Sequence, residues 1–313
     1  MPLDPQTKVA IETMAAAGGP PLEEMEVAAA RQMYRDLSPP GEGEALASVD
    51  NRQVEGAVGE IGIRVYRPEG EGPFGGVVYF HGGGWVLGDL DTYDYFCRSL
   101  CKGAGAVLVS VDYRLAPESK FPAAPEDCYA AVCWTAANAE ALGIDATRLA
   151  VAGDSAGGNL AAVVAQMARD RNGPSLCFQL LLCPVTEHAF DRPSHVENAE
   201  GYLLTLAGMR WFWDHYLEDP RQGESTLASP LRATTLRGLP PAHVATAEYD
   251  PLRDDGELYG AKLREAGVPV TLQRYEGQVH NFFTLGHLFE HGEGASQDLI
   301  ETLRRALVTG VER

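Results

Sequence analysis

Residues 149–158 have the sequence LAVAGDSAGG, an apolar run that ends in small residues around Ser155. The run predicts a buried strand, and the segment after Ser155 predicts a helix. A G-x-S-x-G pattern at such a junction is typical of a tight turn that exposes the hydroxyl, because Gly153 and Gly157 carry no Cβ atoms that could collide. The pattern also occurs by chance in ordinary strand-to-helix turns, so the role of Ser155 depends on the rest of the chain.

A regular alternation of apolar strands and helices surrounds this turn. The expected strands are 76–80, 106–111, 149–152, 177–183, 242–247 and 269–275. The expected helices between them are 92–103, 126–142, 155–170, 253–266 and 295–307. Strands that alternate with helices in this way predict an α/β fold, with a mainly parallel sheet, right-handed crossovers and helices on both faces.

Two parts of the chain depart from this alternation. Residues 5–17 and 22–37 predict two N-terminal helices, and the alternation at residues 61–67 predicts a half-buried edge strand. Between residues 184 and 227 we expect no strand, but an apolar helix rich in aromatic residues spans 206–217. We expect this insertion to form a subdomain on one edge of the sheet.

The composition restricts the class of protein. The chain has 313 residues, of which 45% are apolar and 22% are charged, and these values are typical of a globular enzyme with a large core. The net charge of −19 argues against nucleic acid or an anionic membrane surface as a partner, because both need a basic surface. Residues 1–21 lack the apolar segment of a signal peptide, and no run reaches the roughly 18 apolar residues of a membrane span. We therefore expect a cytoplasmic protein without membrane insertion.

The cysteines could form disulfides or part of a metal site. They are Cys97, Cys101, Cys128, Cys133, Cys177 and Cys183. Cys97 and Cys101 stand four residues apart on an expected helix, a spacing that could supply half of a metal site. Most of the six lie in apolar stretches and no histidine completes a zinc pattern, so we interpret them as reduced structural thiols and predict neither a metal nor another cofactor.

Four loops that follow expected strands carry the polar residues of a possible active site. They are HGGGW at 81–85, the Ser155 turn, EYDP at 248–251 and EGQVH at 276–280. In open α/β sheets, working residues gather at the carboxyl ends of the strands, so these loops should meet. The three glycines at 82–84 suit a loop whose backbone N–H groups hold an oxyanion. A phosphate-binding loop would need a following Lys-Ser/Thr pair or a different glycine spacing, and neither is present.

Position along the chain favours one histidine and one carboxylate. His280 follows its strand directly, whereas the rival histidines lie inside a strand or farther along the chain. These rivals are His243, His287 and His291. Asp250 also follows its strand directly. The rival acids are Glu248, Asp254 and Asp255, of which the last two are expected to begin the next helix. The order Ser155, Asp250, His280 is the one expected of an α/β-hydrolase.

The sequence resembles the hormone-sensitive-lipase-like branch of the α/β-hydrolases, the bacterial family IV carboxylesterases. The resemblance is carried by HGGGW at 81–85, GDSAGGNLA at 153–161, DYRLAPE at 112–118 with FPA at 121–123, and DPLRD at 250–254. It implies an eight-stranded sheet with a helical cap in two parts, residues 1–45 and 184–227, and a core formed by residues 46–183 and 228–313. One departure is Asn281, which stands where the family usually has Gly after the catalytic histidine and puts the local loop geometry in question.

The resemblance also implies a serine carboxylesterase. Ser155 would attack the ester carbonyl, His280 would take its proton and Asp250 would orient the histidine, with a covalent acyl-enzyme intermediate. The oxyanion hole would consist of the N–H groups of Gly83, Gly84 and Ala156. We expect His81 to shape the glycine loop as a hydrogen-bonding partner rather than to act as a second base.

Substrate selection is expected in the aromatic insertion. Six cap residues should form an apolar wall over the site: Tyr202, Leu203, Leu204, Met209, Trp211 and Phe212. Such a compact wall predicts small-molecule esters with short to medium acyl chains. The same machinery would serve an amidase or deacetylase, and a non-catalytic ligand-binding protein of this fold is a further alternative. The sequence leaves both a monomer and a homodimer open.

Overall fold

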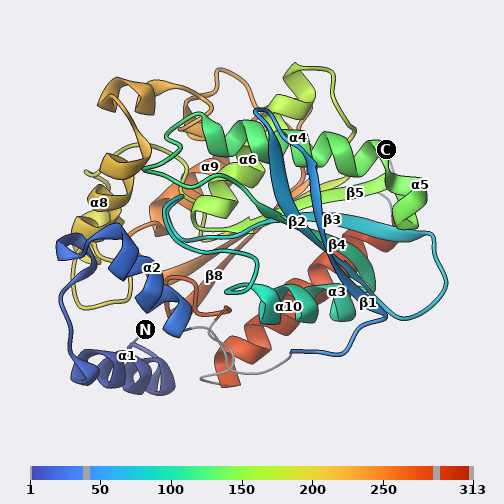
Figure 1. The fold of residues 1–313 in the computed structure, drawn as a ribbon. Helices are drawn as coiled ribbons and strands as arrows, with labels where there is room; N and C mark the ends of the chain where they lie inside the picture. The colour runs from blue at the N-terminus through green and yellow to red at the C-terminus, as the bar shows by residue number, and fades with distance from the viewer. Residues whose placement is uncertain (1, 38–42, 285–289, 310–313) are drawn as a thin grey trace.

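The computed structural model describes residues 2–37, 43–284 and 290–309. Its centre is an eight-stranded sheet in the order β1-β2-β4-β3-β5-β6-β7-β8 (Figure 1). The strands are β1 Ser48–Glu55, β2 Glu60–Arg67, β3 Phe74–Phe80, β4 Ala106–Asp112, β5 Ile144–Asp154, β6 Phe178–Leu182, β7 Ala242–Tyr249 and β8 Val270–Val279. The strands β3 to β8 pair in parallel, whereas β2 is antiparallel to both β1 and β4. The predicted mainly parallel sheet is thereby confirmed.

The antiparallel end of the sheet differs from the prediction. Residues 61–67 do form a strand, but β2 lies between β1 and β4, so the prediction that it is an edge strand is wrong. The edge is β1, which has no counterpart among the predicted elements. Its sequence is the polar SVDNRQVE and Val54 is its one buried residue, so β1 lacks the apolar alternation by which a strand is recognised.

Most helices agree with the predicted segments except at their boundaries, but the short helix Pro193–Glu197 has no predicted counterpart. They are α1 Pro5–Ala17, α2 Val27–Asp36, α3 Asp94–Ala104, α4 Ala123–Ala137, α5 Ala139–Leu142, α6 Ala156–Asp170, α7 Pro193–Glu197, α8 Leu206–Tyr216, α9 Arg253–Glu265 and α10 Glu290–Thr309, with 3₁₀ turns at Leu22–Glu24, Pro220–Glu224 and Pro230–Arg232. The helix expected over 22–37 is divided into a 3₁₀ turn and α2, because Met25 between them has an extended backbone. The helix expected over 126–142 is likewise two helices, α4 and α5, which meet at Asn138.

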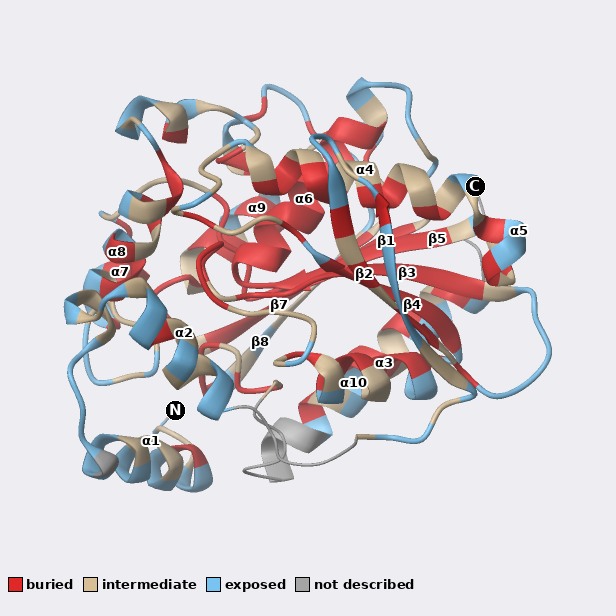
Figure 2. Ribbon diagram, viewed as in Figure 1, coloured by how far each residue is buried: buried red, intermediate tan, exposed pale blue. Residues whose placement is uncertain are grey.

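The core consists of two apolar layers, one on each face of the sheet. Helices α4, α6 and α9 cover one face and α3 and α10 cover the other (Figure 1). Alternate residues of β3 point into opposite layers, with Val78 and Phe80 on the α6 side and Val77 and Tyr79 on the α3 side. The central strands β3, β4, β6 and β7 are therefore buried on both faces, whereas β1 and much of β8 are more exposed (Figure 2). This rigid centre holds the loops at the carboxyl ends of the strands.

The insertion between β6 and β7 lies over the carboxyl ends of the strands, and not beside the sheet edge as expected. Its helix α8 lines the same cavity as Ser155, at the end of β5 in the middle of the sheet. The physical reason is that β6 and β7 are neighbours inside the sheet, so a segment that leaves the end of β6 starts above the sheet. Helix α2 lies on the same side of the molecule as α8 (Figure 1).

Ion pairs and hydrogen bonds attach both cap segments to the core. Arg31 of α2 donates from Nε to the Val86 carbonyl at 2.8 Å and forms a bidentate ion pair with Glu118. At the base of the insertion, the buried Asp255 carboxylate contacts Arg192 and lies 2.9 Å from Nε2 of His195. Asp255 begins α9, so this cluster joins the insertion to a core helix.

Candidate active site

Ser155 stands at a strained turn between β5 and α6. Its φ is +55° and its ψ is −117°, values that a non-glycine residue adopts only where the surrounding structure enforces them. Its N–H donates to the Leu182 carbonyl of the neighbouring strand at 2.8 Å. A Cβ atom on Gly157 would lie 1.9 Å from the Phe80 carbonyl oxygen, so only glycine lets α6 approach the sheet here. The turn directs the Ser155 hydroxyl into a cavity above the sheet.

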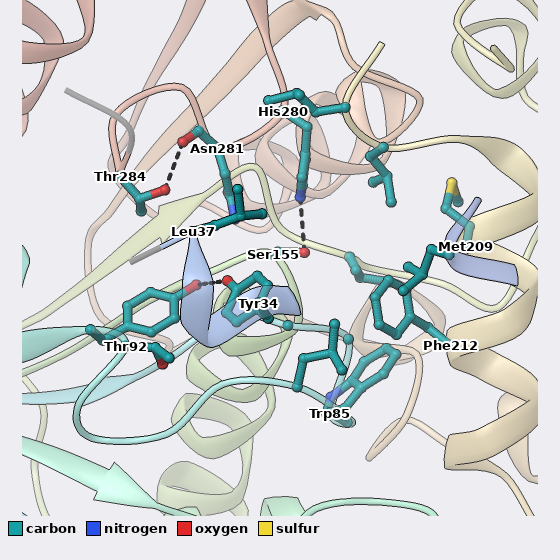
Figure 3. A pocket seen from close by; sticks show the side chains of 18 of the residues that line it. Tyr34, Leu37, Trp85, Thr92, Ser155, Met209, Phe212, His280, Asn281 and Thr284 are labelled. Carbon is teal, nitrogen blue, oxygen red and sulfur yellow. Dashed lines mark hydrogen bonds between the residues drawn. The ribbon is translucent and has the colours of Figure 1, made fainter. Parts of the chain in front are cut away.

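A histidine and a carboxylate complete a hydrogen-bonded series with this hydroxyl. Nε2 of His280 lies 3.0 Å from Oγ of Ser155 (Figure 3). Nδ1 of the same ring lies 2.7 Å from Oδ2 of Asp250. Because a carboxylate can only accept, Nδ1 carries the proton and Nε2 of the neutral ring accepts from the serine. The backbone N–H of Leu252 holds the other Asp250 oxygen at 2.8 Å. Such a series can remove the serine proton and transfer it to a leaving group.

The glycine loop lies beside the serine turn. Gly83 and Gly84 have φ values of +102° and +60°, and among the described residues no acceptor contacts their N–H groups. The N–H of Ala156 belongs to the first turn of α6, where backbone donors have no partner inside the helix. Donors of this kind, next to a nucleophile, can stabilise negative charge that develops on a carbonyl oxygen.

The rival residues have other environments. His243 lies inside β7 and is buried, and Asp254 and Asp255 begin α9 as expected. Glu248 accepts a hydrogen bond from the Gly277 N–H at 2.7 Å. His287 lies outside the described residues, as does the side chain of His291. Among the described candidates, the structure brings only His280 and Asp250 into contact with the Ser155 series.

His81 is a structural residue of the glycine loop. Its side chain is fully buried, its Nδ1 lies 2.7 Å from the Gly82 carbonyl, and its ring stacks on Tyr113 at 4.3 Å between centroids. Burial lowers the pKa of His81 to about 4, so the ring is neutral near pH 7. The family segment 112–118 is also structural, because Arg114 pairs with Asp127 at 2.7 Å.

A cavity of about 270 Å³ opens above Ser155. Four of the six expected cap residues line it: Leu203, Leu204, Met209 and Phe212. Tyr202 and Trp211 do not, which corrects the expectation for these two. Tyr202 packs on Tyr249 at 5.0 Å between ring centroids, and Trp211 is buried against His215 at 4.2 Å. Trp211 lies on a different face of α8 from Met209 and Phe212, which are three residues apart and face the cavity together.

Further lining residues were not among those that the sequence predicted for the site. The N-terminal cap contributes Met14, Leu22, Met33, Tyr34 and Leu37, and α8 also contributes Trp213. Figure 3 shows Met209 and Phe212 on one side of Ser155 and Tyr34 and Thr284 on the other. The amphipathic pattern of α2 was a signal that one of its faces is covered, but no pattern indicates that this face is the wall of a cavity.

Asp154, next to the nucleophile candidate, is a further residue that sequence reasoning missed. Its carboxylate is completely buried and accepts from the Gly82 N–H at 3.0 Å and from the Tyr79 hydroxyl at 2.6 Å. Burial raises the pKa of Asp154 above its usual value. The side chain therefore connects the serine turn with the glycine loop. Its place inside the motif was visible in the sequence, but the direction of its side chain was not.

One group of potential metal ligands lies together among the described residues. It consists of Cys183, Asp250 and His280, whose ligand atoms are within 4.8 Å of one another. Burial raises the pKa of the Cys183 thiol well above its usual range, which disfavours the thiolate that a metal would need. Asp250 and His280 are already hydrogen-bonded to each other, so the group fits a proton-transfer pair better than a metal site. All six cysteines are free thiols in the structure.

The fold and the hydrogen-bonded serine, histidine and aspartate are those of the α/β-hydrolase class. A family model for the alpha/beta hydrolase fold matches residues 77–284. The chain is 45% identical to esterase LipI of Mycobacterium tuberculosis over 288 residues (90% of this chain and 87% of that protein). It is 41% identical to carboxylesterase NlhH of the same organism over 316 residues (97% and 96%).

A solved structure of a thermostable esterase from Pseudomonas putida ECU1011 has a TM-score of 0.93 to this chain, with 41% identity and coverage of 98% of both chains. The chain belongs to the hormone-sensitive-lipase-like family of α/β-hydrolases, and it is a carboxylic ester hydrolase. In the part of the chain that the structure describes, none of the helices combines the length and the apolar character needed to cross a membrane.

Proposed function

We propose that the protein hydrolyses small esters with short to medium acyl chains through a triad of Ser155, His280 and Asp250. The observation that supports this most strongly is the series Asp250 Oδ2 to His280 Nδ1 at 2.7 Å and His280 Nε2 to Ser155 Oγ at 3.0 Å. Both distances are within the range in which a base can take a proton from a nucleophile. Asp250 is fully buried, so its charge acts on the imidazole with little screening by water.

The reaction proceeds in two halves. Oγ of Ser155 attacks the ester carbonyl while Nε2 of His280 takes the hydroxyl proton, and Asp250 stabilises the imidazolium. The tetrahedral intermediate collapses to the acyl-enzyme as His280 gives this proton to the departing alcohol. A water molecule then attacks the acyl-enzyme, His280 takes one of its protons, and collapse of the second intermediate returns that proton to Ser155 and releases the carboxylic acid.

Three backbone donors hold the oxyanion in both halves. They are the N–H groups of Gly83, Gly84 and Ala156. Backbone donors are fixed by the fold before the substrate arrives, so no reorganisation is needed when the charge develops. In comparable sites the loss of one donor lowers kcat by about 10²- to 10³-fold.

The cavity supports uncharged, compact substrates. Its lining among the described residues contains no Asp, Glu, Lys or Arg, so a charged acyl or alcohol group would lose its hydration without gaining a partner. The apolar walls favour each added methylene by about 0.8 kcal/mol until the space is filled. The volume of about 270 Å³, bounded by Met209 and Phe212, supports a limit at medium chain length.

A series of p-nitrophenyl esters from acetate to palmitate tests this proposal in wild type and in Ser155→Ala. We expect kcat/KM to peak at short or medium chains in wild type and to be lost by about 10⁶-fold in Ser155→Ala. A peak at palmitate would refute the proposed substrate range, and equal rates in the two proteins would refute the triad. An anilide with the preferred acyl group, assayed in parallel, separates ester from amide hydrolysis. A cytoplasmic location remains a prediction.

A further inference from the structure

Asn281 follows the base candidate directly and has an unusual backbone. Its φ is +55°, in the left-handed region, which asparagine tolerates better than other residues with a side chain. Its Nδ2 donates to Oδ2 of Asp154 at 2.7 Å. The departure from glycine therefore keeps the turn and adds a hydrogen bond that glycine cannot make. This bond joins the loop of His280 to the residue before Ser155.

The acceptor of this bond also receives a hydrogen bond from the cap side of the site. The Tyr93 hydroxyl donates to the same Oδ2 of Asp154 at 2.8 Å. The hydroxyls of Tyr34 and Tyr93 are 2.9 Å apart. A phenol has one proton, and that of Tyr93 goes to the carboxylate, so Tyr34 is the donor to Tyr93. A single chain of hydrogen bonds therefore runs from α2 through Tyr93 to Asp154.

The two bonds converge on a group that also holds the glycine loop. Oδ1 of Asp154 accepts from the Gly82 N–H at 3.0 Å, next to the proposed oxyanion donors. Asp154 is completely buried, so these few donors alone stabilise its charge. The loss of one donor therefore changes the strength of the remaining hydrogen bonds to the carboxylate. The serine turn, the glycine loop, the His280 loop and helix α2 are all connected through one carboxylate.

We propose that Asn281 and Tyr34 are positioning residues for ester hydrolysis, and that both act through Asp154. Asn281 fixes the backbone after His280, and Tyr34 fixes α2 and Tyr93 against the same oxygen. Together they keep the base and the oxyanion donors in register with Ser155. This inference rests on the proposed triad. This role differs from that of a residue that only lines the cavity, although Tyr93 is a lining residue and Tyr34 and Asn281 are too (Figure 3).

The two roles predict different kinetics. A lining residue that contacts the substrate alters KM, whereas a positioning residue alters the transition state and therefore kcat. We expect Asn281→Gly and Tyr34→Phe each to lower kcat by about 10-fold, with KM changed by less than about twofold. Because both residues act on the same oxygen of Asp154, their effects should not multiply. We expect kcat of the double variant to be about 10- to 20-fold below that of wild type, whereas two independent sites would lower it about 100-fold.

Matched controls are available in the chain. Asn172 also has a positive φ, +51°, but is exposed and remote from the cavity lining, so Asn172→Gly makes the same change without the bond to Asp154. Tyr202 is a cap tyrosine outside the cavity, so Tyr202→Phe controls for the loss of a phenol. Both controls should keep kcat within about twofold of wild type. If Asn281→Gly does not fold, Asn281→Ala replaces it and Asn172→Ala becomes its control, because alanine removes the donor and both positions have a positive φ.

The experiment measures kcat and KM with p-nitrophenyl butyrate and the rate of inactivation by an organophosphonate for each variant and for Ser155→Ala. Slower turnover and slower inactivation in both single variants, with less than multiplicative loss in the double variant, support the inference. Effects confined to KM, multiplicative losses, or variants that match the controls overturn it. Full activity in Ser155→Ala would instead overturn the proposed triad, so the two failures are distinguishable.

Discussion

Gly84→Ala tests the most constrained point of the site. A Cβ atom on Gly84 would lie 2.0 Å from Cδ1 and 2.2 Å from Cγ of Phe212, far inside van der Waals contact. The φ of +60° adds roughly 1–2 kcal/mol of backbone strain for alanine. The loop must therefore move away from α8, which withdraws at least one N–H donor from the oxyanion. We expect kcat to fall by about 10²- to 10³-fold.

Gly105→Ala is the matched control for this substitution. Gly105 has a nearly identical φ of +61° at the end of α3, but a Cβ atom there has nothing within 4 Å. It should lose about 1 kcal/mol of unfolding free energy in urea titrations and keep its kcat. Adding Phe212→Ala to Gly84→Ala removes the clash and leaves the backbone strain. We therefore expect kcat of the double variant to be about tenfold higher than that of Gly84→Ala alone. Steady-state kinetics with p-nitrophenyl butyrate gives the result, and a kcat for Gly84→Ala within about threefold of wild type would refute the reasoning.

Further predictions concern the triad, the cavity, the insertion and acid stability. Asp250→Asn should lower kcat by about 10⁴-fold, because the imidazole loses its orientation and charge partner; a loss below tenfold in the same assay would contradict this role. Phe212→Ala alone should move the preferred acyl chain to greater length, at roughly fourfold in kcat/KM per added methylene; an unchanged profile would exclude Phe212 from the acyl site. Asp255→Ala removes the buried carboxylate that Arg192 and His195 share and leaves Arg192 paired with Glu187, so it should cost about 1–3 kcal/mol of unfolding free energy in urea; a cost below about 0.5 kcal/mol would show that the cluster is not structural. Burial lowers the pKa of His243 to about 4, below about 6.5 in the unfolded chain, so the unfolding free energy should fall by up to about 3 kcal/mol as the pH drops through this range. His243→Leu should reduce this loss, and an identical pH dependence in the variant would contradict it.

The sequence was sufficient for the centre of the fold and for the candidate triad. Buried parallel strands are continuous apolar runs, and their carboxyl ends lie along one edge of the sheet. The sequence alone therefore predicts that residues directly after such strands lie close together. Ser155, Asp250 and His280 all satisfy that rule, and the structure places them within hydrogen-bonding distance.

The remaining features depend on contacts that a linear pattern does not contain. Strand β1 is polar, and only its pairing with β2 makes it a strand. The rotation of α8 decides that Phe212 faces the cavity and Trp211 does not, and in a helix rich in aromatic residues composition cannot fix that rotation. The bond from Asn281 to Asp154 joins residues 127 positions apart. Asn281 was visible only as a departure from glycine, with no indication of its partner.

Covalent labelling of Ser155 tests the central claim most directly. Wild-type protein and Ser155→Ala are treated with an organophosphonate, and intact mass and peptide mapping locate any adduct. A nucleophile activated by His280 should give one adduct on the peptide that contains Ser155, with matching loss of esterase activity, and Ser155→Ala should give none. A folded, active wild-type protein that gains no adduct, or gains it at another residue, would contradict the assignment of Ser155 as the nucleophile.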